Sequence, residues 1–159
     1  MNQRLNYFEI GQPLAKKLMD LNAELVKATT LERSLIDLIN IRVSSLNGCA
    51  FCLDMHVKEA KIHGERELRL YHVAIWKESP LFTPKERAAL AFAEAVNNIG
   101  NDISDELYEE TKKHFSEKEI IDLVFGVSTL NTWNRLNVTF KGQPGSLDAM
   151  FGLNRANLT

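Results

Sequence analysis

The sequence predicts an all-α fold, a compact helical bundle of six to eight helices within a single domain that spans residues 1–159. Apolar residues recur at helical spacing over stretches longer than a typical strand. Three of these stretches open with a Ser or Thr followed three residues later by a Glu, which is the pattern of a capping box. Residues 137–140 are the only stretch that favours a strand, and no repeat or Pro/Gly/Ser-rich linker divides the chain.

Each predicted helix has its own signal. The capping boxes predict where three helices start. Pro84 supports one of these starts because its fixed φ suits the first position of a helix. Glycine or polar residues predict the other helix starts and ends. In chain order, the expected helices are Leu14–Val26, a helix from the Thr29/Glu32 box to Leu46, a helix from Asn47–Gly48 to Gly64, a helix from the Thr83/Glu86 box to about Ala95, Ser104–Phe115, and a helix from the Ser116/Glu119 box to Thr132.

Two of these helices, Leu35–Leu46 and Ile120–Thr132, are apolar on more than one face. Such helices are either central in the bundle or partly buried in an interface between subunits. The sequence leaves both interpretations open, and the second one predicts a homo-oligomer.

Composition and charge exclude several classes of function. The chain has 159 residues, 45% of them apolar and 25% charged, with a formal net charge of -2. This near-neutral balance provides no basic field, so neither nucleic acid nor a membrane surface is an expected partner. The apolar runs are short, and the first residues do not resemble a signal peptide, so we expect a cytoplasmic protein.

Cys49 and Cys52 are the only cysteines and form a Cys-x-x-Cys pair, with His56 four residues further on. On a helix these three side chains share one face. The first turn of a helix favours an anion, and we expect Asn47 or Gly48 to cap it, so a thiolate would be stabilised there. A histidine one turn from Cys52 can take its proton, and the pattern therefore predicts a reactive thiol.

Three other interpretations of this pattern compete with a reactive thiol. A structural zinc site needs four ligands, and His63 lies roughly 10 Å further along the same helix. A thioredoxin-like site requires a preceding strand, which the sequence does not predict. The third alternative is two buried cysteines and a histidine without chemistry, and it leaves three reactive side chains on one helix face unexplained.

The segments NGCAFCLDMHVKEA, KESPLFTPKERAALAFAEAV and HFSEKEIIDLVFGVSTLNTWNRL closely resemble the alkylhydroperoxidase D-like (AhpD-like) group of the carboxymuconolactone decarboxylase superfamily. The resemblance extends from Leu35 to Phe140. It implies an all-helical subunit that assembles into a homotrimer or homohexamer and a thiol peroxidase that reduces organic hydroperoxides.

The resemblance also implies a role for each residue that matches the motif. Cys52 corresponds to the peroxidatic cysteine, Cys49 to the resolving cysteine and His56 to the proton-relay histidine. Asp37 stands where the family usually has a glutamate, so we expect its carboxylate to be catalytic in a relay to Cys52 through His56 or a water; a surface charge or a buried pairing partner is the alternative. Ser45 stands where the family often has a glutamine. An external dithiol reductant or adaptor protein is the implied partner, and no metal or bound organic cofactor is expected.

Other functions and residues remain open at this stage. A carboxymuconolactone decarboxylase-type reaction would leave the dithiol unexplained, whereas a non-catalytic redox sensor or scaffold would form the disulfide without turnover. Asn131, Asn134 and Arg135 match a polar signature of the family, and we expect them to form hydrogen bonds with the cysteine helix or across subunits.

Overall fold

The computed structural model describes residues 2–100 and 102–158, which form nine α-helices and two short 3-10 helices and contain no strand. The elements are α1 (Tyr7–Ile10), α2 (Gln12–Ala28), α3 (Arg33–Leu46), α4 (Ala50–Ile62), α5 (Glu67–His72), η1 (Val73–Ile75), α6 (Pro84–Asn97), α7 (Asp105–Lys112), α8 (Glu117–Phe140), α9 (Asp148–Phe151) and η2 (Leu153–Ala156). The all-α class is confirmed. The count exceeds the expected six to eight because α1 and α9 have four residues each, too few to show a periodic pattern.

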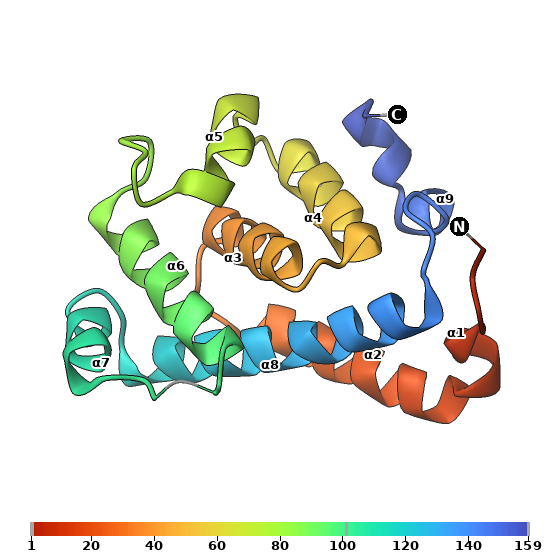
Figure 1. Cartoon of the computed structure of the whole chain (residues 1–159), viewed down its shortest axis with the longest axis horizontal. Coiled ribbons are helices and arrows are strands. Elements are labelled where there is room, and N and C mark those ends of the chain that lie inside the picture. The colour runs from red at the N-terminus through yellow and green to blue at the C-terminus, as the bar shows by residue number, and fades with distance from the viewer. Residues whose placement is uncertain (1, 101, 159) are drawn as a thin grey trace.

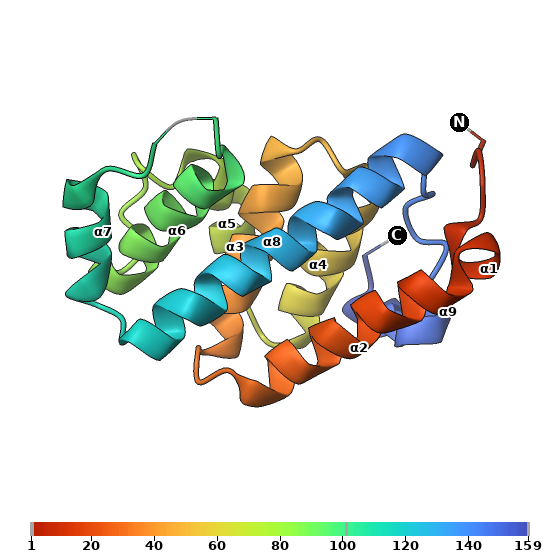
Figure 2. The same ribbon diagram turned by 90° about the horizontal axis from the view of Figure 1, so that it is seen from below.

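The long helix α8 organises the bundle (Figure 1). Helices α3 and α4 form an antiparallel pair that packs against it, and α2 runs beside it on another side (Figure 2). Helices α6 and α7 lie at one end of α8, and the short helices α1 and α9 lie at the other. The connection between α3 and α4 therefore faces the C-terminal half of α8.

Helix α3 is central and buries side chains on two faces. On one face Ile39 and Val43 join an apolar cluster with α6 and α8, which includes Phe92. On the other face Leu38 and Ile41 join a second cluster with α4, η1 and α6. For this helix the structure explains the apolar pattern without a second subunit.

Helix α8 differs because part of its apolar surface is not covered. Ile121 and Phe125 are each about half exposed, and Val124 lies between them in sequence. No helix in the part of the chain that the structure describes is both long and apolar enough to cross a membrane.

Two of the three predicted capping boxes are confirmed. Thr83 with Glu86 and Ser116 with Glu119 form both reciprocal hydrogen bonds at the starts of α6 and α8. The box predicted at Thr29 is wrong, because α2 continues to Ala28 and uses Thr29 as its C-cap. Its hydroxyl then accepts from the N–H of Leu31 at 3.2 Å, and α3 begins only at Arg33.

The strand suggested for residues 137–140 is also wrong, because these residues form the last turn of α8. The β-branched residues there favour a strand only weakly, and continuing the helix satisfies their backbone groups. The helix ends where Lys141 adopts a left-handed conformation with φ of 58°, and its N–H donates to the carbonyl of Asn137.

Candidate active site

The cysteine pair lies where the chain turns from α3 into α4. Gly48 has φ of +63°, a conformation that other residues rarely adopt, and the N–H of Cys49 donates to the carbonyl of Ser44 at 3.0 Å. Cys49 itself is the N-cap of α4, and its Sγ accepts from the backbone N–H of Cys52 at 3.3 Å. The expected cap at Asn47 or Gly48 is therefore wrong, because the tight turn brings Cys49 to that position.

Asparagines of neighbouring helices hold this turn in place. The Nδ2 of Asn47 lies 2.7 Å from the Oδ1 of Asn131 and 2.8 Å from the Oδ1 of Asn134. It also pairs with Asn97 of α6. The expected hydrogen bonds of Asn131 and Asn134 thus reach the turn before the cysteine helix, whereas Arg135 donates to the carbonyl of Asn131 in its own helix.

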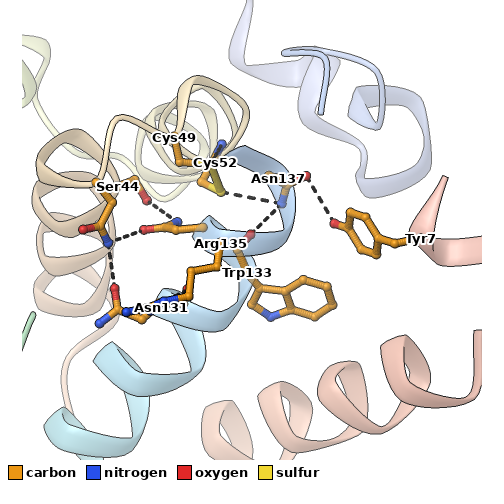
Figure 3. The surroundings of a disulfide bond; sticks show 10 residues. Tyr7, Ser44, Cys49, Cys52, Asn131, Trp133, Arg135 and Asn137 are labelled. Atoms are coloured by element: carbon orange, nitrogen blue, oxygen red, sulfur yellow. Dashed lines mark hydrogen bonds between the residues drawn. A yellow bond between two sulfur atoms is a disulfide. The ribbon is translucent and has the colours of Figure 1, made fainter. Parts of the chain in front are cut away.

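Cys49 and Cys52 form a disulfide bond in the first turn of α4 (Figure 3). Both residues are 2% exposed. Cys52 lines a cavity of about 300 Å³. Cys49 is not among the described residues that line it. A molecule in the cavity would therefore contact Cys52 rather than Cys49.

The cavity is mainly apolar and lies between α2, α3, α4, α8 and the C-terminal segment. Its volume is at the lower end of the range usual for small-molecule sites. Leu147 and Phe151 close it from the C-terminal side, and His56 and Glu59 join Cys52 on the α4 wall. The cavity thus combines a cysteine and a few polar groups with an apolar lining.

His56 forms an ion-pair geometry with Glu59, with 2.7 Å between Nδ1 and Oε2. Burial alone would raise the pKa of Glu59, but the hydrogen bond from His56 and the nearby charges of Arg33 and His63 hold it below 4.5. Glu59 is therefore a carboxylate at neutral pH that fixes one nitrogen of the imidazole. Since His56 is four residues from Cys52 on the same helix, the two side chains share one face of α4, and both line the cavity.

Asp37 pairs with a different histidine. Its Oδ2 lies 2.7 Å from the Nδ1 of His63, and its Oδ1 lies 3.4 Å from the Nε of Arg33. The side chain is fully buried, and this burial raises the pKa of Asp37 above 3.8, with Glu59 contributing in the same direction and His63 and Arg33 opposing it. Within the described residues, no hydrogen bond joins Asp37 to His56.

The two histidine–carboxylate pairs do not form a metal site with the cysteines. His63 is engaged with Asp37 and His56 with Glu59. Over residues 2–100 and 102–158, no three His, Cys, Asp or Glu side chains gather closely enough to hold a metal ion.

Asn137, in the last turn of α8, points toward Cys52 (Figure 3). Its Nδ2 lies 3.7 Å from the Sγ of Cys52 and donates to the carbonyl of Trp133 at 3.1 Å. The hydroxyl of Tyr7 donates to its Oδ1 at 3.2 Å. Burial raises the pKa of Tyr7 to about 12, although the hydrogen bond with Asn137 lowers it, so this hydroxyl keeps its proton at neutral pH.

Comparison with known proteins places this arrangement in a family. The family model described as the carboxymuconolactone decarboxylase family matches residues 12–95, which include both cysteines and His56. The chain belongs to this family. It is 37% identical over 147 residues to the uncharacterised protein YdfG of Bacillus subtilis, which covers 92% of this chain and 99% of YdfG.

Solved structures agree with the AhpD-like assignment. A protein of unknown function from Agrobacterium tumefaciens, ATU0492, named as a candidate AhpD antioxidant defence protein, is 38% identical, with a TM-score of 0.86 over 90% of this chain and 98% of the other. The debrominase Bmp8 shares the fold, with 21% identity and a TM-score of 0.79 over 94% of this chain and 80% of the other. This AhpD-like fold therefore occurs with more than one chemistry.

Sequence reasoning missed three polar residues around Cys52 in this family member. Glu59 lies three residues after His56, a helical spacing that identifies it as a partner of that histidine. Asn137 was hidden by the interpretation of its segment as a strand. Tyr7 carries no sequence signal, because its contact with Asn137 joins residues 130 positions apart.

Proposed function

We propose that this protein is a thiol-dependent peroxidase that reduces organic hydroperoxides through a Cys49–Cys52 dithiol/disulfide cycle. The observation that carries the proposal is that Cys52 lines an apolar cavity together with His56, while its disulfide partner Cys49 is not among the described residues that line it. Membership of the AhpD-like group supports the same chemistry.

The first step oxidises Cys52. His56 takes the thiol proton, and the thiolate attacks the terminal oxygen of the hydroperoxide ROOH, which breaks the O–O bond and forms a sulfenic acid. The alkoxide that leaves receives the proton from His56 and departs as the alcohol ROH. Glu59 holds the Nδ1 of His56 and stabilises the imidazolium between these two transfers.

The second step closes the disulfide. The sulfur of Cys49 attacks the sulfenic sulfur of Cys52, and water leaves with the thiol proton. An external dithiol then reduces the disulfide by exchange and is itself oxidised to a disulfide. Because both cysteine residues are only 2% exposed, the donor must reach their sulfurs through the cavity or by a local opening of the α3–α4 turn.

The lining of the cavity favours the organic part of the substrate. Its walls offer side chains such as Leu130, Trp133 and Phe151, whose apolar surface would be removed from water by an alkyl or aryl group. Hydrogen peroxide has no such group. Organic hydroperoxides are therefore the expected substrates.

We further propose a cytoplasmic, homo-oligomeric enzyme. A reducing compartment such as the cytoplasm would supply the dithiol. A homotrimer or homohexamer would cover the exposed apolar side chains Ile121, Val124 and Phe125 of α8.

Steady-state hydroperoxide consumption with a panel of dithiol donors tests the proposal. Turnover should require a donor, favour an organic hydroperoxide over hydrogen peroxide, and be lost in Cys52→Ser. Disulfide formation with one equivalent of peroxide but no turnover with any donor would instead indicate a redox sensor.

A further inference from the structure

The carboxamide of Asn137 has a defined orientation. The carbonyl of Trp133 can only accept a hydrogen bond, so the end of the amide that faces it, at 3.1 Å, must be the nitrogen. The same Nδ2 faces the Sγ of Cys52 at 3.7 Å. One N–H is therefore used by the helix carbonyl, and the second is directed at the sulfur.

Two further contacts hold the amide in this orientation. The hydroxyl of Tyr7 donates to the Oδ1 at 3.2 Å and brings α1 against the end of α8. Gly142 packs so closely on the other side that a Cβ at this position would clash with the Oδ1 of Asn137. Since Asn137 is 5% exposed, water does not compete for these groups.

We propose that Asn137 is a further catalytic residue, whose Nδ2–H donates to the sulfur of Cys52 and stabilises its thiolate, and that Tyr7 is a positioning residue for this amide. The inference rests on the proposed function in taking Cys52 as the nucleophile. It adds a contribution from α8 to those of the α4 dipole and His56.

The physical reason is the difference between the two states of the sulfur. A neutral thiol is a weak acceptor, whereas a thiolate carries a full charge and gains more from an N–H donor. A hydrogen bond to the charged form lowers the pKa of an acid. The amide also brings no charge of its own, so it stabilises the anion without pairing with it in a salt bridge.

Alkylation of the single thiol in a Cys49→Ser background tests the proposal. The rate of reaction with iodoacetamide, followed against pH by mass spectrometry, gives the pKa of Cys52. Asn137→Leu should raise that pKa by about one pH unit, the effect of losing one hydrogen bond to a charged group. Asn137→Asp should raise it further, because it places a negative charge beside the thiolate.

Tyr7→Phe separates positioning from structure. It removes one hydroxyl without adding a group near the sulfur, and it should raise the pKa of Cys52 by less than Asn137→Leu does. The matched control is Tyr71→Phe, whose hydroxyl is on the exposed surface of α5 and should leave the profile unchanged. Circular dichroism identifies any variant that fails to fold.

The parent pH profile in a folded Asn137→Leu or Asn137→Asp variant would overturn the role of Asn137. If both of these variants unfold, an unshifted profile in Tyr7→Phe overturns the proposal, and a shifted one supports it. Alkylation uses neither peroxide nor reductant. A missing peroxidase activity would therefore refute the proposed function without removing the shift, and an unshifted thiol would refute this inference without affecting turnover.

Discussion

Helix α4 takes part in two carboxylate–histidine pairs of equal length that differ in their surroundings. His56 and Glu59 lie within the helix, 2.7 Å apart, and both line the cavity beside Cys52. His63 caps the far end of the helix and pairs with Asp37 of α3, also at 2.7 Å. The two pairs therefore join the same kinds of group, but among the described residues only His56 and Glu59 line the cavity that Cys52 lines.

Burial raises the pKa of both carboxylates, but the net shifts are opposite. The Glu59 side chain is 25% exposed, and His56, Arg33 and His63 together outweigh desolvation, so its pKa falls below 4.5. The Asp37 side chain is 0% exposed, and desolvation outweighs His63 and Arg33, so its pKa rises above 3.8. Glu59 is thus stabilised as an anion, whereas Asp37 is not.

The largest expected effect separates the two histidines. His56→Gln should lower the rate of hydroperoxide turnover by roughly 10²–10⁴-fold, because it removes the group that exchanges the proton with Cys52. The measurement is steady-state peroxide consumption with a saturating dithiol. His63→Gln is the matched control and should retain a rate close to that of the parent protein; equal losses in the two variants would show that the pairs are not functionally distinct.

A smaller effect separates the two carboxylates. Glu59→Gln should lower the rate by about tenfold, as for the carboxylate partners of metal-bound histidines, because the imidazole loses the group that orients it. Asp37→Asn should cost less, since Asp37 reaches His63 and Arg33. A larger loss in Asp37→Asn than in Glu59→Gln would return the relay role to Asp37, as the family motif implies.

The opposite pKa shifts predict opposite dependences of stability on pH. The folded pKa of Glu59 is lowered, so its contribution to stability is present above 4.5 and is lost as the pH falls through the folded pKa. The folded pKa of Asp37 is raised, so its ionisation weakens the fold as the pH rises from 3.8 through the folded pKa. The free energy of unfolding changes by about 1.4 kcal/mol when the folded and unfolded pKa values of a group differ by one.

Urea unfolding at about pH 4 and about pH 7 measures these two contributions. The quantity compared is the free energy of unfolding of each variant minus that of the parent protein. From the lower to the higher pH, this difference should rise for Asp37→Asn and fall for Glu59→Gln. Changes of the same sign in the two variants would contradict the contrast between the two carboxylates.

The sequence was sufficient where local rules decide the structure. The boxes at Thr83 and Ser116 predicted two helix starts because both hydrogen bonds of each box join residues three positions apart. The shared face of Cys52 and His56 followed from helical spacing, and both line one cavity. The capping box predicted at Thr29 was wrong because Thr29 is the C-cap of the preceding helix α2. The local pattern does not show which of the two helices the residue caps.

The remaining features depend on contacts between distant segments. The pairing of Asp37 with His63 joins α3 to the end of α4, and the contact of Tyr7 with Asn137 joins α1 to the last turn of α8. Neither contact has a periodic or motif signal. Glu59 is different, because its spacing from His56 is a local signal that the sequence contains.

The central claim is that Cys52, served by His56 and Glu59, is the sulfur that reacts with peroxide. One equivalent of an organic hydroperoxide, followed by a sulfenic acid trap and mass spectrometry, tests it in Cys49→Ser and Cys52→Ser variants. We expect a trapped sulfenic acid on Cys52 in the first variant and a largely unoxidised Cys49 in the second. Trapping on Cys49 with an unreacted Cys52 would contradict it.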